Sequence, residues 1–402
     1  MRLVPTESLS VRGSSKKIGG HKRVLPVITT VLLPAYNEAK ALPEVLMNVL
    51  GVIDNTYEIL VVDDGSSDDT ADIARAAGCR VIRHDKNMGK GAAVRTGVSN
   101  ARGRYIVVMD ADATYPADAI PLTVNLLADH DFVRCIRSSG TEHIPLFNRL
   151  GNWVFDMLLF GIHRLEGKDH LSGLYGVRSE AIRTFGIESD GFDIEVELGV
   201  KVRAYGLSIA TLPIGYHPRI GEKKLRPVHD GLRILSRLMN MALIANPRLV
   251  FIHPGILVWA VSGILLVLLA SGPISTPFIG LHTTAFLASA LGMVIGFQMI
   301  VFGIAAGLYA TTVGMRSEPW LAIVSTPLVR RASAVIGAGL ATIGFAWSVA
   351  IAGVWVLSGT GPFGQSQEFI LGAVIMLMGI HLTMASLFVS ALSHKKRDLV
   401  HA

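Results

Sequence analysis

The 402-residue chain has only two cysteines, Cys79 and Cys135, and each lies in a stretch with the pattern of a buried strand. So few cysteines do not form the disulfide framework of a secreted protein, and a reducing compartment fits better. Charged residues are also scarce, at 17% against 50% hydrophobic residues, and the mean hydropathy is +0.47. This composition argues against a chain that is soluble throughout.

The N-terminus lacks the apolar segment of a secretory signal, so we expect only a basic tail over residues 1–26. Such a tail is either disordered or rests on anionic lipid. The net charge of +6 would also suit nucleic acid, but the chain has no groove-reading motif and no stacking platform. Its basic residues cluster beside the apolar segments instead, which favours lipid phosphates as partners and excludes nucleic acid.

Motifs for two other kinds of nucleotide site are also missing. No GxGxxG fingerprint follows the first expected strand, which argues against a dinucleotide-binding fold. Gly89-Lys90-Gly91 lacks the upstream glycine and the Ser or Thr after lysine that a phosphate loop needs. The apolar half also lacks the chain of ionisable groups that a proton-coupled transporter requires.

Four apolar segments are long enough to cross a bilayer, and together they predict a membrane domain over 251–392. They cover about 252–271, 283–308, 334–357 and 369–392. Two connectors, Gly272–Leu281 and Ser358–Glu368, contain no Lys or Arg. The basic residues lie in the other connector and in the 393–402 tail, at Arg316, Arg330, Arg331, Lys395, Lys396 and Arg397. The positive-inside rule then predicts a multi-pass protein of the cell membrane with both termini and the soluble half in the cytoplasm.

Small residues recur in these segments and predict close helix packing, namely Gly337, Gly339, Gly344 and Gly353. Gln298 and His381 are polar residues within these apolar segments, and the sequence allows each to be either a functional group or a packing residue. Val228–Ala245, within a predicted segment 228–250, has an apolar and a basic face, and Leu146–Ile162 is rich in aromatics. Both are candidate interfacial helices, with covers of the soluble core as the alternative.

Residues 27–227 alternate between strand and helix patterns. The expected strands are Val27–Leu33, Glu58–Val62, Cys79–Arg83 and Tyr105–Met109, and the expected helices are Ala39–Leu50, Asp68–Ala77 and Gly89–Ala101. This alternation predicts an α/β domain with a mostly parallel sheet covered by helices on both faces. In such sheets ligands bind at the carboxyl ends of the strands.

Polar segments occur at four successive strand ends: 34–38, 63–68, 87–91 and 110–112. Any one of them could be ordinary turn or capping chemistry. Asp110 and Asp112 are the strongest candidates for a site, because two carboxylates one residue apart at a strand end can face the same cation. Acids this close repel one another, so the pair predicts a Mg²⁺ or Mn²⁺ ion that bridges substrate phosphates.

At this point the motifs resemble glycosyltransferase family 2. The segments that carry this resemblance are VLLPAYNEAKALPEVL, ILVVDDGSSDDT, NMGKGAAVRTG and MDADATYP. Two later segments, GFDIEVEL and YHPRIGEKKLRP, resemble one branch of the family, the polyprenyl- or dolichyl-phosphate sugar synthases, to which dolichol-phosphate mannose synthase belongs. The resemblance covers roughly residues 29–235. It implies a GT-A fold, a divalent metal and inverting transfer of a hexose from a GDP- or UDP-linked donor to a polyprenyl (dolichyl or undecaprenyl) phosphate.

The resemblance also implies roles for individual residues. The donor would be bound by Pro34, Ala35, Tyr36, Glu38, Asp63, Asp64, Lys90, Asp110, Ala111 and Asp112. Asp110 and Asp112 would hold the metal, and Arg219 and Lys224 would join Asp112 in catalysis by closing over the phosphates. The acceptor phosphate would face Arg137, Arg149 and Arg219. A phosphate acceptor needs no general base, since its second pKa is near ~6.

The sequence departs from that branch at three places. Thr114 replaces a common glutamine beyond the second aspartate, Cys135-Ile136 replaces Gly-Ser before Arg137, and Lys223 replaces a common serine. A processive polysaccharide synthase is the alternative enzyme, although its Gln-x-x-Arg-Trp motif is absent, and an inactive lipid- or sugar-binding membrane scaffold is the other alternative. The sequence leaves the sugar, the nucleotide, the lipid length and a possible homo-oligomer open.

Overall fold

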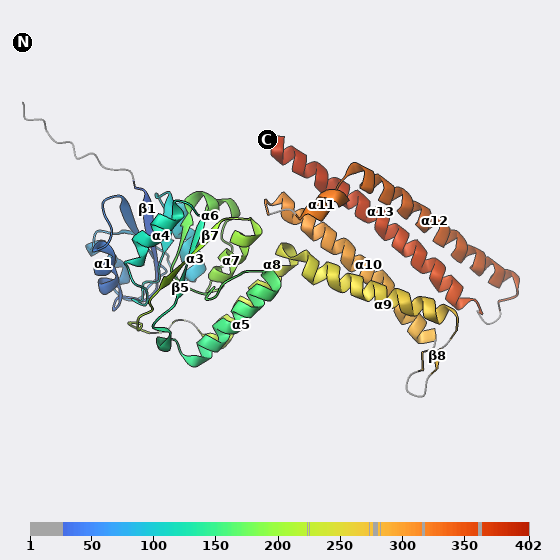
Figure 1. Ribbon diagram of the computed structural model, residues 1–402, viewed down its shortest axis with the longest axis horizontal. Helices are drawn as coiled ribbons and strands as arrows, with labels where there is room; N and C mark the ends of the chain where they lie inside the picture. The colour runs from blue at the N-terminus through green and yellow to red at the C-terminus, as the bar shows by residue number, and fades with distance from the viewer. Residues whose placement is uncertain are drawn as a thin grey trace, which may run out of the picture.

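The computed structural model describes residues 27–222, 224, 226–272, 274–275, 280–281, 283–315, 318–360 and 364–401. The predicted N-terminal tail lies outside this range, as do Lys223 and Arg316. Figure 1 shows an α/β domain, in blue to green, followed by a bundle of long helices, in yellow to red. The predicted order, a GT-A-type α/β domain and then four apolar helices, is confirmed.

The α/β domain consists of strands and helices that alternate along most of its length. Its strands are β1 Thr29–Ala35, β2 Tyr57–Asp63, β3 Arg80–Arg83, β4 Tyr105–Val108, β5 Phe132–Arg137, β6 Tyr175–Arg178 and β7 Ile209–Ile214. Its helices are α1 Leu42–Leu50, α2 Thr70–Ala76, α3 Lys90–Asn100, α4 Ala119–Leu127, η1 Thr141–His143, α5 Leu146–His163, α6 Ser179–Phe185, α7 Ile194–Ala204 and α8 Pro227–Ala245.

The seven strands form one sheet in the order β3-β2-β1-β4-β6-β5-β7. All pairings are parallel except those of β6, which is antiparallel to β4 and β5. The predicted mostly parallel sheet is therefore confirmed. The first strand ends two residues later than expected, at Ala35, because its pairing with β2 continues to Ala35 opposite Asp63. The first helix begins at Leu42 rather than Ala39, with Pro43 in its first turn.

Alternate residues of the central strands pack into two separate cores. Val31 and Leu33 belong to the core under α1, α2 and α4, whereas Leu32 between them points to the core under α3, α6 and α7. A side-chain period of two produces this division, because each strand is buried on both faces. Both helix layers thus hold the central strands rigidly, with their carboxyl ends at one edge of the sheet.

Helices α5 and α8 lie side by side at the edge of the domain nearest the bundle (Figure 1). They share a small core with α7, to which α8 contributes Ile234 and Leu238. Large apolar side chains nevertheless remain exposed on both helices, among them Trp153 and Phe160 of α5 and Leu232 of α8. The two helices thus have a face packed on the domain and a second apolar face, and the predicted interfacial role stays a prediction.

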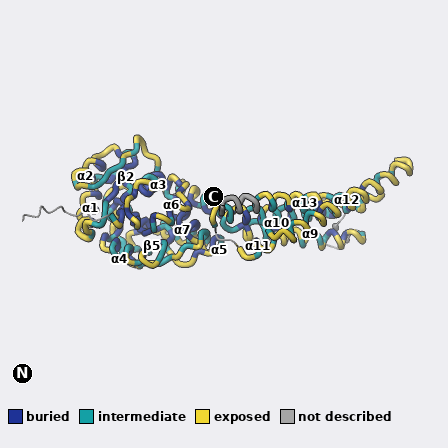
Figure 2. The backbone as a smooth tube through the Cα atoms, turned by 90° about the horizontal axis from the view of Figure 1, so that it is seen from above, coloured by how far each residue is buried: buried dark blue, intermediate teal, exposed yellow. Residues whose placement is uncertain are grey.

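The bundle contains α9 His253–Ala270, preceded by the π-helix η2 Arg248–Ile252, and α10 Thr283–Thr312, α11 Pro319–Val324, α12 Pro327–Leu357 and α13 Ser366–His401, with the short strands β8 Ile274–Ser275 and β9 Gly280–Leu281. Four stretches are long and apolar enough to cross a membrane: Arg248–Ala270, Thr283–Thr312, Pro327–Leu357 and Ser366–Leu392. The predicted four spans are confirmed. Figure 2 shows that many residues along these helices are exposed, as expected for helices that face lipid.

Glycine packing in the bundle follows the prediction only in part. A Cβ on Gly337 would lie 2.8 Å from the carbonyl oxygen of Gly379, and one on Gly344 would lie 2.4 Å from the Met376 nitrogen, so these positions let α12 and α13 meet. Gly339 and Gly353 face open space within the described residues, and the expectation of close packing was wrong for both. They lie on the outer face of α12.

Candidate active site

A cavity of about 350 Å³ lies at the carboxyl ends of β1, β2 and β4. All four predicted strand-end segments contribute to its wall. The lining residues are Pro34, Ala35, Tyr36, Glu38, Asp64, Asn87, Gly89, Lys90, Ala93, Asp110, Ala111, Asp112, Phe192, Arg219, Lys224 and Arg226. Parallel strands bring these segments together because their carboxyl ends share one edge of the sheet.

Asp64 fixes the loop that carries the third segment. Its carboxylate is buried and accepts hydrogen bonds from the backbone nitrogens of Met88, at 2.9 Å, and Gly89, at 2.7 Å. His84 Nδ1 lies 2.7 Å from the same carboxylate, and its Nε2 lies 2.9 Å from Thr96 Oγ1 of α3. No sequence motif marks His84, which acts by orienting Asp64.

Lys90 is the first residue of α3 and joins two acidic groups in the wall of the cavity. Its Nζ lies 2.7 Å from Asp110 Oδ1 and 2.6 Å from Glu195 Oε1 of α7. Burial by itself would lower the pKa of Lys90, but the two carboxylates outweigh it and raise that pKa well above the ordinary value. Burial also raises the pKa of Glu195, against the opposing effect of Lys90. Lys90 is therefore a fixed cation.

Asp112 is buried and forms an ion pair with Arg219. The backbone nitrogen of Thr114 donates to its Oδ1 at 3.0 Å, and the nitrogen of Ile220 donates to its carbonyl oxygen at 3.1 Å. Burial, and then the charge of Asp110, raise the pKa of Asp112. The segment of Arg219 is thus held directly against the acidic turn, and its predicted closure over the phosphates stays a prediction.

Glu38 completes the charged wall opposite Asp112. Glu38 is 6% exposed, and burial raises its pKa to about 7, although Lys224 acts to lower it. Lys224 Nζ donates to the Asn37 carbonyl oxygen at 3.0 Å, and Arg219 Nη1 lies 4.0 Å from Glu38. Several acids and bases are therefore held close together with little solvent, which makes their charge state sensitive to an incoming ionic ligand.

The acidic pair differs from its prediction in one respect. Asp110 and Asp112 are not uncompensated, because Lys90 and Arg219 neutralise them within the chain. The described residues contain no group of three His, Cys, Asp or Glu side chains placed to hold a metal. The two carboxylates still fit a divalent cation, since both line one cavity and a diphosphate would supply further oxygen ligands. Thr114, which stands where the branch commonly has glutamine, hydrogen-bonds to Asp112.

Three predicted site residues lie outside the cavity wall. Asp63 is fully buried beneath it, where its carboxylate accepts from the Ser66 nitrogen at 3.0 Å and pairs with Arg83 at 3.1 Å. Arg137 pairs with Asp169 and lies 5.3 Å over the Tyr216 ring. Arg149 is exposed in the first turns of α5. Their predicted contacts with substrate remain predictions.

Phe192 and Arg226 are lining residues that the sequence analysis did not single out. Phe192 belongs to the loop 186–193 between α6 and α7, which has no strand-end position to mark it. The loop packs closely on the start of α3: a Cβ on Gly89, whose φ is +100°, would lie 2.2 Å from the Asp190 carbonyl oxygen, and one on Gly91 would lie 2.3 Å from that of Ser189. Only glycine permits this approach.

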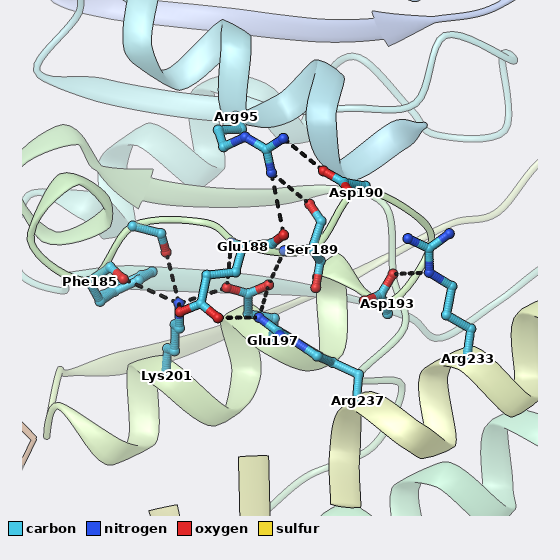
Figure 3. Close-up of polar contacts among 11 residues, drawn as sticks. Arg95, Phe185, Glu188, Ser189, Asp190, Asp193, Glu197, Lys201, Arg233 and Arg237 are labelled. Atoms are coloured by element: carbon cyan, nitrogen blue, oxygen red, sulfur yellow. Dashed lines mark hydrogen bonds and ion pairs between the residues drawn. The ribbon is translucent and has the colours of Figure 1, made fainter. Parts of the chain in front are cut away.

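Figure 3 shows the polar contacts that hold the loop 186–193 against α7 and α8. The fully buried Glu197 of α7 accepts from the backbone nitrogens of Glu188, at 2.8 Å, and Ser189, at 2.6 Å. Lys201 Nζ lies 2.7 Å and Arg237 Nη2 2.9 Å from the same carboxylate. These partners outweigh burial and lower the pKa of Glu197 to about 2. We call Glu188, Glu197, Lys201 and Arg237 the support network.

The support network joins the cavity to helix α8. Arg237 belongs to α8, and a second arginine of that helix, Arg233, lies 3.5 Å from Asp193 at the end of the loop (Figure 3). From the other side, Arg95 of α3 pairs with Asp190 at 2.7 Å. The two glutamates in the first turn of α7 have different partners. Glu195 contacts Lys90, and Glu197 supports the loop.

Comparison with known proteins agrees with this geometry. Residues 30–175 match the family described as "Glycosyl transferase family 2". A "Dolichyl-phosphate hexose transferase" of Haloferax volcanii is 33% identical over 222 residues, which cover 54% of this chain and 96% of that protein. "Glycosyltransferase AglJ" of the same organism is 30% identical over 289 residues, covering 70% of this chain and 94% of the relative.

A further relative extends through the membrane half. The "Low-salt glycan biosynthesis hexosyltransferase Agl6" of Haloferax volcanii is 26% identical over 389 residues, or 94% of this chain and 92% of that protein. Among solved structures, a glucosyl-3-phosphoglycerate synthase of Mycobacterium tuberculosis superposes on 54% of this chain and 79% of its own, with a TM-score of 0.44 and 23% identity. That score is too low to carry an argument about this chain.

Proposed function

The chain belongs to glycosyltransferase family 2 and is a glycosyltransferase, and from this premise we propose that it transfers a hexose from a nucleotide-diphospho-sugar to a polyprenyl phosphate. The observation that carries the proposal is the convergence of Asp110, Asp112, Lys90, Arg219 and Lys224 on one cavity at the carboxyl edge of the sheet. Cations and carboxylates in one small cavity suit a diphosphate with its counter-ion. The Haloferax volcanii relative named a dolichyl-phosphate hexose transferase supports the acceptor.

The reaction exchanges one bond at the anomeric carbon of the sugar. An oxygen of the polyprenyl phosphate forms the new bond, the bond to the donor diphosphate breaks, and the nucleoside diphosphate leaves with the electron pair. Attack opposite the leaving group inverts the anomeric configuration. The acceptor needs no base, since a phosphate monoester is mostly dianionic at neutral pH. Catalysis then consists of alignment and of stabilising the leaving diphosphate.

The residues of the cavity suit the two halves of that task. Asp110 and Asp112 would hold a Mg²⁺ or Mn²⁺ ion, which supplies positive charge to the diphosphate when bound. Lys90 is held in place by Glu195 and adds a fixed positive charge at the wall. Arg219 now pairs with Asp112, and we infer that it turns to the leaving phosphate when the donor enters. Lys224 and Arg226 reach the cavity from the same segment.

The acceptor would approach from the side of α5 and α8. Both helices expose apolar side chains next to the membrane helices, which suits contact with a bilayer surface. Arg149 lies on α5 with an exposed side chain and fits capture of a lipid phosphate. We propose that this side of the protein faces the cytoplasm, on the basis of the lysines and arginines in the connectors. A cysteine placed at Ser366 should then react with an impermeant thiol reagent outside intact cells.

The test is a panel of GDP- and UDP-linked hexoses incubated with membranes that contain the full chain and polyprenyl phosphate. Mass spectrometry of the lipid extract should find polyprenyl phosphate plus one hexose, and the nucleoside diphosphate should form in equal amount. A polymer of many sugars would favour the processive synthase. Complete absence of lipid-linked sugar with every donor would overturn the proposal.

A further inference from the structure

A second cavity, of about 620 Å³, lies where the α/β domain meets the membrane helices. Its wall is built from the ends of α5, α7, α8 and α10, from η2 and from the start of α11. The two cavities share no lining residue among those described. Figure 1 shows this junction between the domain and the bundle. We call it the junction cavity.

The junction cavity carries excess positive charge. Arg164 at the end of α5, Arg203 near the end of α7 and Arg248 at the start of η2 all line it. Glu318 is the single acidic side chain among the described lining residues, and it lies 2.9 Å from Arg248. Arg164 and Arg203 have no ion-pair partner in the described part of the chain. Two positive charges therefore remain uncompensated in one recess.

The wall also contains apolar side chains, and one buried donor has no partner among the described residues. Trp320 Nε1 is buried and has no hydrogen-bond acceptor among the described residues, while the Arg248 guanidinium lies 5.7 Å over its ring. Ile244 and Leu249 are 36% and 39% exposed. Two histidines, His163 and His253, also line the cavity. Burial lowers the pKa of His163. A cationic recess with apolar sides suits a group that is anionic at one end and hydrocarbon at the other.

The position of the cavity fits the headgroup level of a bilayer. Helix α10 has 30 residues and is about 45 Å long, whereas the hydrocarbon core of a bilayer is about 30 Å thick. Counted from its start at Thr283, α10 crosses the hydrocarbon in about 20 residues, which places its last turns, where Gly307 and Ala310 line the cavity, beyond it. Basic pockets between membrane helices at this level bind lipid headgroups.

The ligand of the junction cavity is not the acceptor in its reacting position. Glu195, which contacts Lys90 in the donor cavity, and Arg203, which lines the junction cavity, lie eight residues apart on α7. A helix rises about 1.5 Å per residue, so they are separated by about 12 Å along its axis. A phosphate held at Arg203 cannot reach a sugar bound beside Lys90, since reacting atoms must be about 3–3.5 Å apart.

We propose that the junction cavity binds the phosphate headgroup of an anionic bilayer phospholipid and that Arg164 and Arg203 are its main contacts. The bound lipid joins the catalytic domain to the membrane helices, because its headgroup contacts α5 and α7 while its chains lie along η2 and α10. This site goes beyond sugar transfer and does not depend on which donor is used.

The test uses the purified full chain in detergent without nucleotide-sugar, titrated with phosphatidylglycerol and, separately, phosphatidylcholine, polyprenyl phosphate and inorganic phosphate. Native mass spectrometry counts the bound lipid, and thermal unfolding measures stabilisation. We expect one phosphatidylglycerol bound tightly and phosphatidylcholine at least tenfold more weakly. The Arg203→Ala variant should lose about ten- to a hundredfold in affinity for phosphatidylglycerol, and Arg203→Lys should lose less.

Arg331→Ala is the matched control, because Arg331 is an exposed arginine at the start of α12 that does not line the cavity. Equal loss of phosphatidylglycerol in Arg203→Ala and Arg331→Ala would overturn the proposal, since only general surface charge would then matter. Inorganic phosphate that stabilises as well as the lipid, or binding of polyprenyl phosphate alone, would also overturn it. The Lys variant keeps the test decisive if the alanine variant fails to fold.

Discussion

The donor cavity and the support network are both clusters of buried ionic groups, yet their carboxylates titrate in opposite directions. In the cavity, burial raises the pKa of Glu38 to about 7, and it also raises the pKa of Asp112. In the support network, the pKa of Glu197 is lowered to about 2 by Lys201 and by the hydrogen bonds it accepts, despite burial. In the cavity, burial outweighs the nearby cations, whereas in the support network the cation and the hydrogen bonds outweigh burial.

This difference separates a binding site from a structural cluster. Glu197 has two backbone donors and two cationic side chains around it, so it needs nothing more. Glu38 and Asp112 share Arg219, and Lys224 also acts on Glu38. Besides burial, the charge of Asp110 raises the pKa of both carboxylates. Such a cavity becomes more stable when a ligand brings cations or further hydrogen bonds, whereas a completed network gains nothing from one.

The largest effect should come from removing one cavity carboxylate. Asp112→Asn should reduce transfer by at least about 10³-fold, because a metal ligand and the partner of Arg219 are lost together. Stability should change little, since the substitution is nearly isosteric and Arg219 still lies 4.0 Å from Glu38. Turnover and thermal unfolding of the purified chain measure both, and a chelator should reproduce the loss in the parent enzyme. Undiminished turnover in the variant would show that Asp112 holds no metal.

The two glutamates should respond to pH in opposite ways. Glu38 has a raised folded pKa, so its contribution to stability is complete below about pH 4.5 and is lost as pH rises through about 7. Glu197 has a lowered folded pKa, so its contribution is present above about pH 4.5 and is lost as pH falls towards 2. Each shift corresponds to about 3 kcal/mol.

Thermal unfolding across pH 2–9 of the parent, Glu38→Gln and Glu197→Gln should separate these two windows. Glu38→Gln should flatten the profile between about pH 4.5 and 7, and Glu197→Gln should flatten it only below about 4.5. Identical profiles for the two variants would refute the distinction between the clusters.

The two arginines that are predicted to contact the acceptor phosphate differ in the same way, since one has an ionic partner and the other has none among the described residues. Arg137 is already paired with Asp169 and stacked on Tyr216, whereas Arg149 is exposed and has no ion-pair partner among the described residues. Arg149→Ala should therefore raise the KM for polyprenyl phosphate about ten- to a hundredfold and leave the KM for the donor and the stability unchanged. Arg137→Ala should lower stability. Steady-state kinetics with each substrate varied separately decide this, and an effect of Arg149→Ala on donor binding alone would contradict it.

The sequence predicted the residues that line the cavity at strand ends better than the residues of the loop 186–193 and of the support network. Asp64, Lys90 and Asp112 follow strands, and the rule that ligands bind at strand ends locates them without knowledge of the fold. Phe192 belongs to a loop and Arg237 to a helix far along the chain. Only the tertiary structure brings Phe192 to the cavity and Arg237 to Glu197 behind it. No local pattern marks such residues, because their role depends on what they contact.

Local sequence patterns also failed to predict which cations pair with the acidic residues of the cavity and which glycines pack between the helices of the bundle. The acidic pair Asp110 and Asp112 was evident from spacing, but the cations that neutralise it, Lys90 and Arg219, are separated from it by many residues. Apolar length predicted the four membrane helices well. It did not predict which glycines lie between helices, since that depends on the rotation of each helix about its axis.

The smallest effect should distinguish two arginines that hold the same loop. Arg237 is mostly buried and reaches the fully buried Glu197, whereas the Arg95–Asp190 pair is 37% and 52% exposed. Water and salt weaken the exposed pair, which is worth about 0–1 kcal/mol, while loss of Arg237 leaves Glu197 with one cation fewer. Arg95→Ala should raise the donor KM by less than about fivefold, and Arg237→Ala should raise it more and lower the melting temperature. Kinetics with the donor varied, at low and high salt, measure this. Equal effects of the two substitutions would mean that the loop depends on neither side in particular, and that the support network does not position the donor cavity.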